Sequence, residues 1–157
     1  MTLRETRAQY GVSAKEISEN INIPLRTYVR YEQKEDVNNL KYIKILELLK
    51  EKYSITEDKG VYTLEQLKKL ICEVLYEYNE NIEFCYIFGS YAKGYATENS
   101  DVDICVNTSL SGLKFVGLIE KLREKLNKKV DVIRFNDLKN NFELINEIMK
   151  DGIKIYG

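Results

Sequence analysis

Three short apolar runs in the second half of the chain constrain its fold more than any other feature. They occupy residues 84–88, 102–106 and 130–133 and are rich in β-branched and aromatic side chains. Runs of four or five such residues are typical of strands and are too short to be core helices. A further short strand is expected at residues 153–156. Together these runs predict a small sheet.

Segments with helical spacing of apolar residues surround the strands, at residues 63–78, 112–127 and 138–150. Helices that alternate with strands predict an α+β domain, in which an α/β two-layer fold is built on a small mixed sheet. The middle helix is expected to bury one face. That face consists of Leu113, Val116, Ile119 and Leu122.

The first part of the chain predicts helices only. We expect a short helix at residues 3–10, a second ending at Asn20, a third beginning at Pro24 and a longer one from Leu40. Pro24 fits the first position of a helix because no amide donor is needed there. The spacing therefore predicts an all-α domain over residues 1–55.

A segment without clear periodicity separates the two parts. Residues 56–62 contain Gly60 between polar neighbours, a composition that favours a turn or a linker. The predicted organisation is therefore an all-α domain at residues 1–55, a linker at 56–62 and the α+β domain at 63–157.

The absence of histidine from all 157 residues excludes several kinds of catalysis. Serine–histidine and cysteine–histidine nucleophiles, histidine-ligated zinc and imidazole acid–base chemistry all depend on that side chain. What remains is carboxylate, lysine or tyrosine chemistry, or a hard metal ion held by oxygen ligands.

The charges of the chain are balanced, with 24 Lys and Arg residues against 25 Asp and Glu residues. Contact with a nucleic acid must therefore come from a local patch. The basic residues at 121–125, with Lys128 and Lys129, are expected on a solvated helix face. No run approaches 18 apolar residues and no signal peptide is recognisable, so we expect a soluble, cytoplasmic protein without a membrane partner.

Three aspartates are placed where they can act together. Asp101 and Asp103 are two positions apart at a predicted strand, so both carboxylates leave the same face of the sheet. Asp131 lies in another apolar run, where a buried carboxylate is costly unless it meets a charge, so we expect it beside the other two on a neighbouring strand. Close carboxylates repel one another unless a cation lies between them, which favours Mg²⁺ or Mn²⁺.

A phosphate-binding turn is expected directly after the first of these strands. Gly89 and Ser90 leave the strand and enter a helix, where free amides and a hydroxyl can hold phosphate oxygens. Gly89 places no side chain between its backbone and the ligand. A carboxylate metal site next to a phosphate-binding turn indicates phosphoryl or nucleotidyl transfer.

The spacing of these residues resembles a family signature. Gly89-Ser90, ten intervening residues, and then Asp101 and Asp103 match the pattern of the polymerase-β-like nucleotidyltransferases. The resemblance extends over residues 63–157. The short domain is similar to the minimal nucleotidyltransferase group, whose members often act as antitoxins of HEPN ribonuclease toxins by transferring AMP to a toxin tyrosine.

The resemblance implies roles for individual residues. It implies three catalytic carboxylates that also hold Mg²⁺ or Mn²⁺: Asp101, Asp103 and Asp131. It implies a set that binds the triphosphate of ATP: Gly89, Ser90 and Lys93. The family usually has arginine where Lys93 stands, and lysine keeps the charge without the bidentate contact. The implied partner is a HEPN-type toxin encoded nearby.

The helical part also resembles a known family. Short helix, tight turn and a further helix with basic residues is the pattern of a helix-turn-helix, and residues 2–50 resemble repressor-like (XRE-type) domains. This resemblance implies that Arg26, Thr27 and Arg30 lie at operator DNA. The alternative is a helical module that docks onto the second domain or onto a partner.

Three functions are therefore considered. The leading one is an adenylyltransferase antitoxin that also represses its own operon. A second is a helix-turn-helix transcriptional regulator whose nucleotidyltransferase half is a nucleotide sensor or scaffold. A third, a small-molecule transferase such as one acting on aminoglycosides, is disfavoured because those enzymes resemble longer chains with an extra helical domain.

Overall fold

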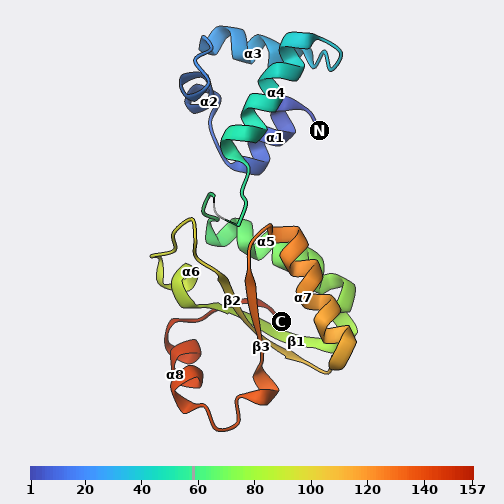
Figure 1. The fold of residues 1–157 in the computed structure, drawn as a ribbon, viewed down its shortest axis with the longest axis vertical. Coiled ribbons are helices and arrows are strands. Elements are labelled where there is room, and N and C mark those ends of the chain that lie inside the picture. Colours follow the sequence, from blue (N-terminus) through green and yellow to red (C-terminus); the bar gives the residue numbers. More distant parts are fainter. Residues whose placement is uncertain (58) are drawn as a thin grey trace. The chain divides into compact units, whose positions relative to one another are not determined.

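The computed structural model describes residues 1–57 and 59–157, and it divides into two compact units (Figure 1). The first unit is Met1–Ser54 and the second is Ile55–Gly157. The predicted linker at residues 56–62 lies within the second unit. In it the amide of Thr56 and the carbonyl of Lys59 are 2.8 Å apart, while Asp58 lies outside the described residues. No helix in the described parts of the chain is both long and apolar enough to cross a membrane.

The first unit contains four helices whose ends are set by local hydrogen bonds. They are α1 (Leu3–Tyr10), α2 (Ala14–Asn20), α3 (Leu25–Lys34) and α4 (Leu40–Tyr53). The hydroxyl of Thr2 accepts from the amide of Glu5 while the Glu5 carboxylate accepts from the amide of Thr2, which is a capping box. Gly11 ends α1 in the left-handed conformation at φ +65°.

These helices enclose a core of their own, which consists of Leu3, Ile17, Tyr28, Tyr42, Ile45 and Leu49. The observed boundaries of these helices agree with the expected ones to within one residue. The one difference is at the start of α3, where Pro24 is the N-cap and Leu25 is the first helical residue. Leu40 is 83% exposed although it begins a helix rich in apolar residues. The buried position in that turn belongs to Tyr42, whose hydroxyl accepts from the amide of Leu3 at 2.9 Å.

The second unit is a four-stranded sheet with helices on both faces. Its strands are β1 (Ile82–Phe88), β2 (Val102–Thr108), β3 (Val130–Arg134) and β4 (Ile153–Tyr156), in the order β3-β2-β1-β4. Its helices are α5 (Leu64–Leu75), α6 (Gly89–Lys93), α7 (Gly112–Leu126) and α8 (Phe142–Asp151), with single 3₁₀ segments at Tyr76–Asn81 (η1) and Phe135–Asp137 (η2).

The sheet is mixed, as predicted. β1 pairs antiparallel with both β2 and β4, whereas β2 and β3 pair parallel. The chain crosses from β2 to β3 through helix α7. The α+β fold class expected from the sequence is therefore confirmed.

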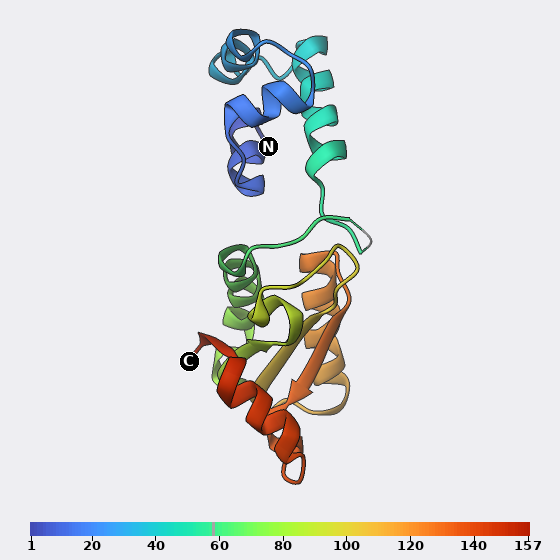
Figure 2. The same ribbon diagram turned by 90° about the vertical axis from the view of Figure 1, so that its left-hand side faces the viewer.

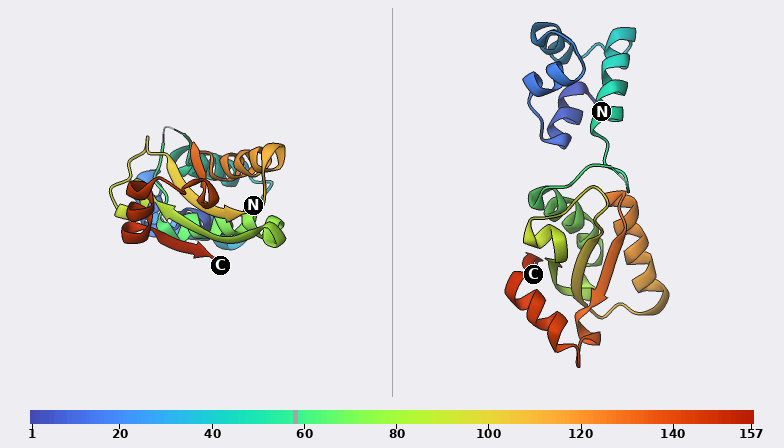
Figure 3. Two further views of the ribbon diagram at one scale, coloured as in Figure 1. Left: turned by 90° about the horizontal axis from the view of Figure 1, so that it is seen from below. Right: turned by 60° about the vertical axis from the view of Figure 1, so that its left-hand side comes forward.

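The two faces of the sheet bury different residues because strand side chains alternate. Val102 and Ile104 of β2 pack in the cluster that contains the buried residues of α5 and α7. Cys105 of the same strand packs instead against Ile148 of α8. Figures 1 and 2, and the right-hand view of Figure 3, accordingly show α7 and α8 on opposite sides of the strands.

The expected buried face of α7 is only partly correct. Leu122 is buried, but Leu113 is 90% exposed and Val116 is also exposed. The buried positions are instead Leu118, Leu122 and Leu126. A series of steps of three residues rotates around a helix with 3.6 residues per turn, whereas steps of four stay closer to one face.

Candidate active site

The predicted catalytic carboxylates lie on the α8 face of the sheet. Asp103 of β2 is directly opposite Asp131 of β3 in the parallel register. Asp103 is two residues before Cys105 and Asp131 is two residues before Ile133, so their side chains leave the same face of the sheet as these two residues, which pack towards α8. Asp131 is exposed, because β3 is the edge strand of the sheet. The expectation that Asp131 is buried among β-branched residues is therefore wrong, although it does lie beside Asp103.

Asp101 lies immediately before β2 and not within it. The strand begins at Val102, whose amide donates to the carbonyl of Lys129 at 2.9 Å. This hydrogen bond ties the segment that carries Asp101 to the segment that leads into β3.

Asp103 experiences the charges of the surrounding carboxylates. Burial raises its pKa to about 6, and the negative charges of Asp131, Asp101 and Glu147 contribute to the same shift. Repulsion of this kind is relieved when a cation or a proton joins the site.

Gly89 is required by the approach of Asp103 to the backbone. Gly89 has φ +69°, a conformation that other residues rarely adopt. A Cβ atom at this position would collide with Oδ2 of Asp103 and lie 3.0 Å from its Cγ. The sequence suggested glycine as a means of admitting phosphate, and the structure adds that it admits the Asp103 side chain.

Ser90 and Lys93 lie on the short helix α6 that follows β1. The carbonyl of Ser90 accepts from the amides of Gly94 at 3.0 Å and Tyr95 at 3.1 Å, so the backbone turns back at this point. Nζ of Lys93 is 2.6 Å from Oε1 of Glu147 in α8. Lys93, predicted to bind the triphosphate, therefore has a protein partner.

The described residues contain no group of three or more Asp, Glu or Cys side chains that converges closely enough to enclose a metal ion. Their chemistry nevertheless fits a hard divalent cation, since the donors are carboxylate oxygens and Asp103 carries the repulsion noted above. Mg²⁺ or Mn²⁺ binding by Asp101, Asp103 and Asp131 remains a prediction.

Sequence reasoning missed two residues next to this site. Glu147 lies on the buried side of α8 near Leu144 and Ile148, a signal that was available because a charged residue interrupts an apolar face. Lys128 was expected on a solvated helix face, and this is wrong, because it is only 3% exposed. Lys128 lies between the end of α7 and the start of β3, where no helical or strand periodicity indicates which side chains are buried.

Lys128 joins two loops of the second unit. Its Nζ donates to the carbonyl of Glu98 at 2.5 Å and to the carbonyl of Glu57 at 3.4 Å. Glu98 also accepts from the amide of Gly60 through its side chain at 3.3 Å. The loop that precedes Asp101 is therefore fixed from two sides.

The predicted DNA-binding residues lie on α3 of the first unit. Arg26 and Arg30 are exposed one turn apart, while Thr27 is half-buried beside them. The guanidinium of Arg30 lies 5.5 Å from the centre of the Tyr31 ring. These side chains line a surface depression of about 760 Å³.

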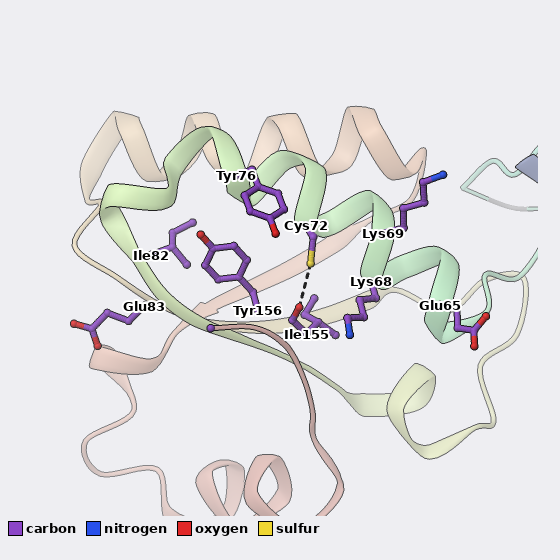
Figure 4. A pocket seen from close by; sticks show the side chains of 10 residues that line it. Glu65, Lys68, Lys69, Cys72, Tyr76, Ile82, Glu83, Ile155 and Tyr156 are labelled. Atoms are coloured by element: carbon purple, nitrogen blue, oxygen red, sulfur yellow. Dashed lines mark hydrogen bonds between the residues drawn. The ribbon is translucent and has the colours of Figure 1, made fainter.

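A further open cavity, not lined by Asp101, Asp103 or Asp131, lies between α5 and β4 (Figure 4). It has a volume of about 750 Å³, and its polar lining combines lysines with glutamates. The thiol of Cys72 donates to the carbonyl of Ile155 at 3.1 Å, and the rings of Tyr76 and Tyr156 meet edge to face across the opening. None of the predicted site residues lines this cavity.

Known proteins are similar to the second unit. Residues 65–157, more than half of the chain, match the family described as polymerase beta, nucleotidyltransferase. "Protein adenylyltransferase MntA" of Thermococcus cleftensis is 37% identical over 85 residues, which are 52% of this chain and 86% of that protein. MJ1215 of Methanocaldococcus jannaschii is 39% identical over 80 residues, which are 48% of this chain and 93% of that protein.

A solved structure supports the same assignment. A crystal structure described as a toxin-antitoxin with AMP-PNP superimposes with a TM-score of 0.51 at 26% identity, covering 57% of this chain and 73% of that one. The matched family and the matched relatives coincide with the unit in which Asp103, Asp131 and Gly89 meet. The chain therefore belongs to the polymerase beta nucleotidyltransferase family and is a nucleotidyltransferase.

Proposed function

We propose that this chain is a metal-dependent protein adenylyltransferase that transfers AMP from ATP to a tyrosine hydroxyl of a HEPN-type toxin. The observation that carries the proposal is the pairing of Asp103 with Asp131 directly beside Gly89. The name of the Thermococcus cleftensis relative supports protein adenylylation, and the toxin-antitoxin structure with AMP-PNP supports both ATP and a toxin partner. The chain would act in the cytoplasm as an antitoxin.

The side chains divide the chemistry among them. Asp101, Asp103 and Asp131 would hold Mg²⁺ or Mn²⁺, which when bound neutralises triphosphate charge and makes the attacking hydroxyl more acidic. The acceptor oxygen forms a bond to the α-phosphorus while the bond to pyrophosphate breaks. Asp131 is exposed and can accept the proton that leaves the hydroxyl. Gly89 and Ser90 would hold the triphosphate.

The openness of the site favours a macromolecular acceptor. Asp131 is exposed, and the strand that carries it, β3, lies at the edge of the sheet. A small acceptor is normally enclosed in a pocket of about 300–1,000 Å³ that buries most of its surface. An acceptor protein brings its own surface to an open carboxylate site.

For the first unit we propose binding to operator DNA, and thereby autoregulation. The exposed guanidinium groups of Arg26 and Arg30 on one face of α3 support this role. The alternative function is a transcriptional regulator whose nucleotidyltransferase half serves as a nucleotide sensor or scaffold. Retention of Asp101, Asp103 and Asp131 favours the enzyme, because a sensor does not need all three.

The decisive experiment uses the protein encoded beside this chain as the acceptor. Incubation with ATP and Mg²⁺ should add the mass of one or more adenylyl groups to tyrosine and should lower the ribonuclease activity of the partner. The double variant Asp101→Asn/Asp103→Asn should produce neither effect. If that variant neutralises the partner as well as the unmodified chain does, protection comes from binding alone.

A further inference from the structure

Lys93 and Glu147 form an ion pair between the two helices on the carboxylate face of the sheet. Nζ of Lys93 lies 2.6 Å from Oε1 of Glu147, and both side chains are about one-third exposed or less. Helix α6 carries Lys93 three residues after Ser90, and α8, which carries Glu147, packs on α6. The pair therefore connects the predicted triphosphate-binding turn to a helix that carries none of the predicted site residues.

Helix α8, which carries Glu147, packs on the face of the sheet from which Asp103 projects, since its Ile148 lies against Cys105 of β2. The Lys93–Glu147 ion pair therefore lies on the helices that flank the Asp103 side of the sheet. Glu147 thus presents an anionic oxygen to Lys93, as a phosphate group of a nucleotide would.

A lysine ammonium is a compact charge whose attraction to one anion is weakened when it already contacts another. We propose that Glu147 competes with the nucleotide for Lys93: its carboxylate holds the ammonium until a phosphate group of the nucleotide replaces it. The inference rests on the proposed function of Lys93 as a triphosphate contact. It assigns Glu147 a role in setting the affinity for nucleotide, separate from the transfer reaction.

The test measures binding of ATP with Mg²⁺ by calorimetry, without any acceptor, so that no transfer takes place. Glu147→Gln removes the competing charge and should tighten binding by about two- to tenfold, because Lys93 is released for the phosphates. Lys93→Met should weaken binding. In the Lys93→Met background, Glu147→Gln should give no gain, because the effect passes through the ammonium.

The control is Glu77→Gln, which breaks another 2.6 Å ion pair, with Lys121 of α7, on the opposite side of the sheet. It should leave the dissociation constant unchanged. Unchanged or weaker binding by Glu147→Gln overturns the proposal, since it would show that the glutamate only fastens α8. An equal gain in the Lys93→Met background also overturns it, since the effect would then be general charge repulsion.

Failure of this inference can be told apart from failure of the proposed function. If the unmodified chain binds ATP with Mg²⁺ and Glu147→Gln does not tighten that binding, only the role of Glu147 is overturned. If the unmodified chain does not bind ATP with Mg²⁺ at all, the nucleotide site itself is wrong, and the role of Glu147 is overturned with it.

Discussion

Arg7 and Glu32 form a bidentate ion pair that joins α1 to α3 in the first unit. Nε of Arg7 donates to Oε2 of Glu32 at 2.9 Å and Nη2 donates to Oε1 at 2.8 Å. The Glu32 side chain is only 8% exposed, and Arg4 approaches it at 3.6 Å from the surface. Because Glu32 lies on α3, this ion pair fixes the orientation of α1 relative to the helix that carries Arg26 and Arg30.

Glu32→Gln should destabilise the first unit by about 2–4 kcal/mol, because it leaves the Arg7 guanidinium without a counter-charge. The Lys44–Glu47 pair, which is exposed on both sides, provides the control. Glu47→Gln should cost less than about 1 kcal/mol. Urea unfolding monitored by circular dichroism measures both, and equal effects would contradict the structural role of the buried pair.

The Arg7–Glu32 pair should also make the stability of the first unit depend on pH. Hydrogen bonds from Arg7 hold the pKa of Glu32 below its usual value of 4.5. A carboxyl whose pKa is lowered by folding stabilises the folded state above the unfolded pKa, and this contribution is lost as the pH falls through the folded pKa. Thermal unfolding of the unmodified chain should therefore shift down below about pH 4.5, and Glu32→Gln should flatten that part of the curve.

Asp103→Asn should abolish transfer while raising stability in the absence of metal. The raised pKa of Asp103 means that its ionised form is disfavoured in the folded state, so the gain should be present above about pH 6. It should disappear below about pH 3.8, where the carboxyl is protonated whether folded or not. We expect on the order of 1 kcal/mol after solvent screening, measured by thermal unfolding in EDTA. Retained transfer would remove the proposed role of Asp103.

Gly89→Ala should be more damaging than a substitution at another left-handed glycine. Gly94 has φ +83° and open space around its Cβ position, so Gly94→Ala should cost only backbone strain, about 1–2 kcal/mol. Gly89→Ala adds a collision with Asp103 to the same strain. Chemical denaturation compares the two variants, and an equal loss in both would show that Asp103 can move aside without cost.

Lys128→Met should destabilise the second unit by about 1–3 kcal/mol, because the carbonyls of Glu98 and Glu57 lose their donor. The neighbouring Lys129 is exposed, and Lys129→Met should change stability by less than about 0.5 kcal/mol. Urea unfolding of both variants distinguishes the buried lysine from the surface one.

Helix and strand positions could largely be predicted because each element carries its own local signals. Thr63 and Gln66 form a capping box at the start of α5, and the alternation of Val102 and Ile104 with Asp103 fixes the faces of β2. Of the residues in the Gly-Ser and Asp-x-Asp spacing, the structure places Gly89 directly against Asp103.

What could not be predicted depends on contacts between distant segments. Lys128 is buried by contacts with two loops, at Glu98 and Glu57, which lie 30 and 71 residues before it in the sequence. The exposure of Asp131 depends on the position of β3 at the edge of the sheet. The order of strands in a sheet cannot be predicted from the sequence of any one strand. The Lys93–Glu147 pair spans 54 positions and needs α8 to fold back on α6.

The edge position of β3 determines how the carboxylate site can discriminate between reactants. Among the described residues no strand pairs with the outer side of β3, so the exposed Asp131 carboxylate can be reached from the edge of the sheet as well as from its α8 face. The site would then set no upper limit on the size of the proposed acceptor. For such an acceptor, selectivity would arise from the match between two protein surfaces around the point of reaction, so substitutions far from the carboxylates would change which molecule is modified without changing the bond that is made.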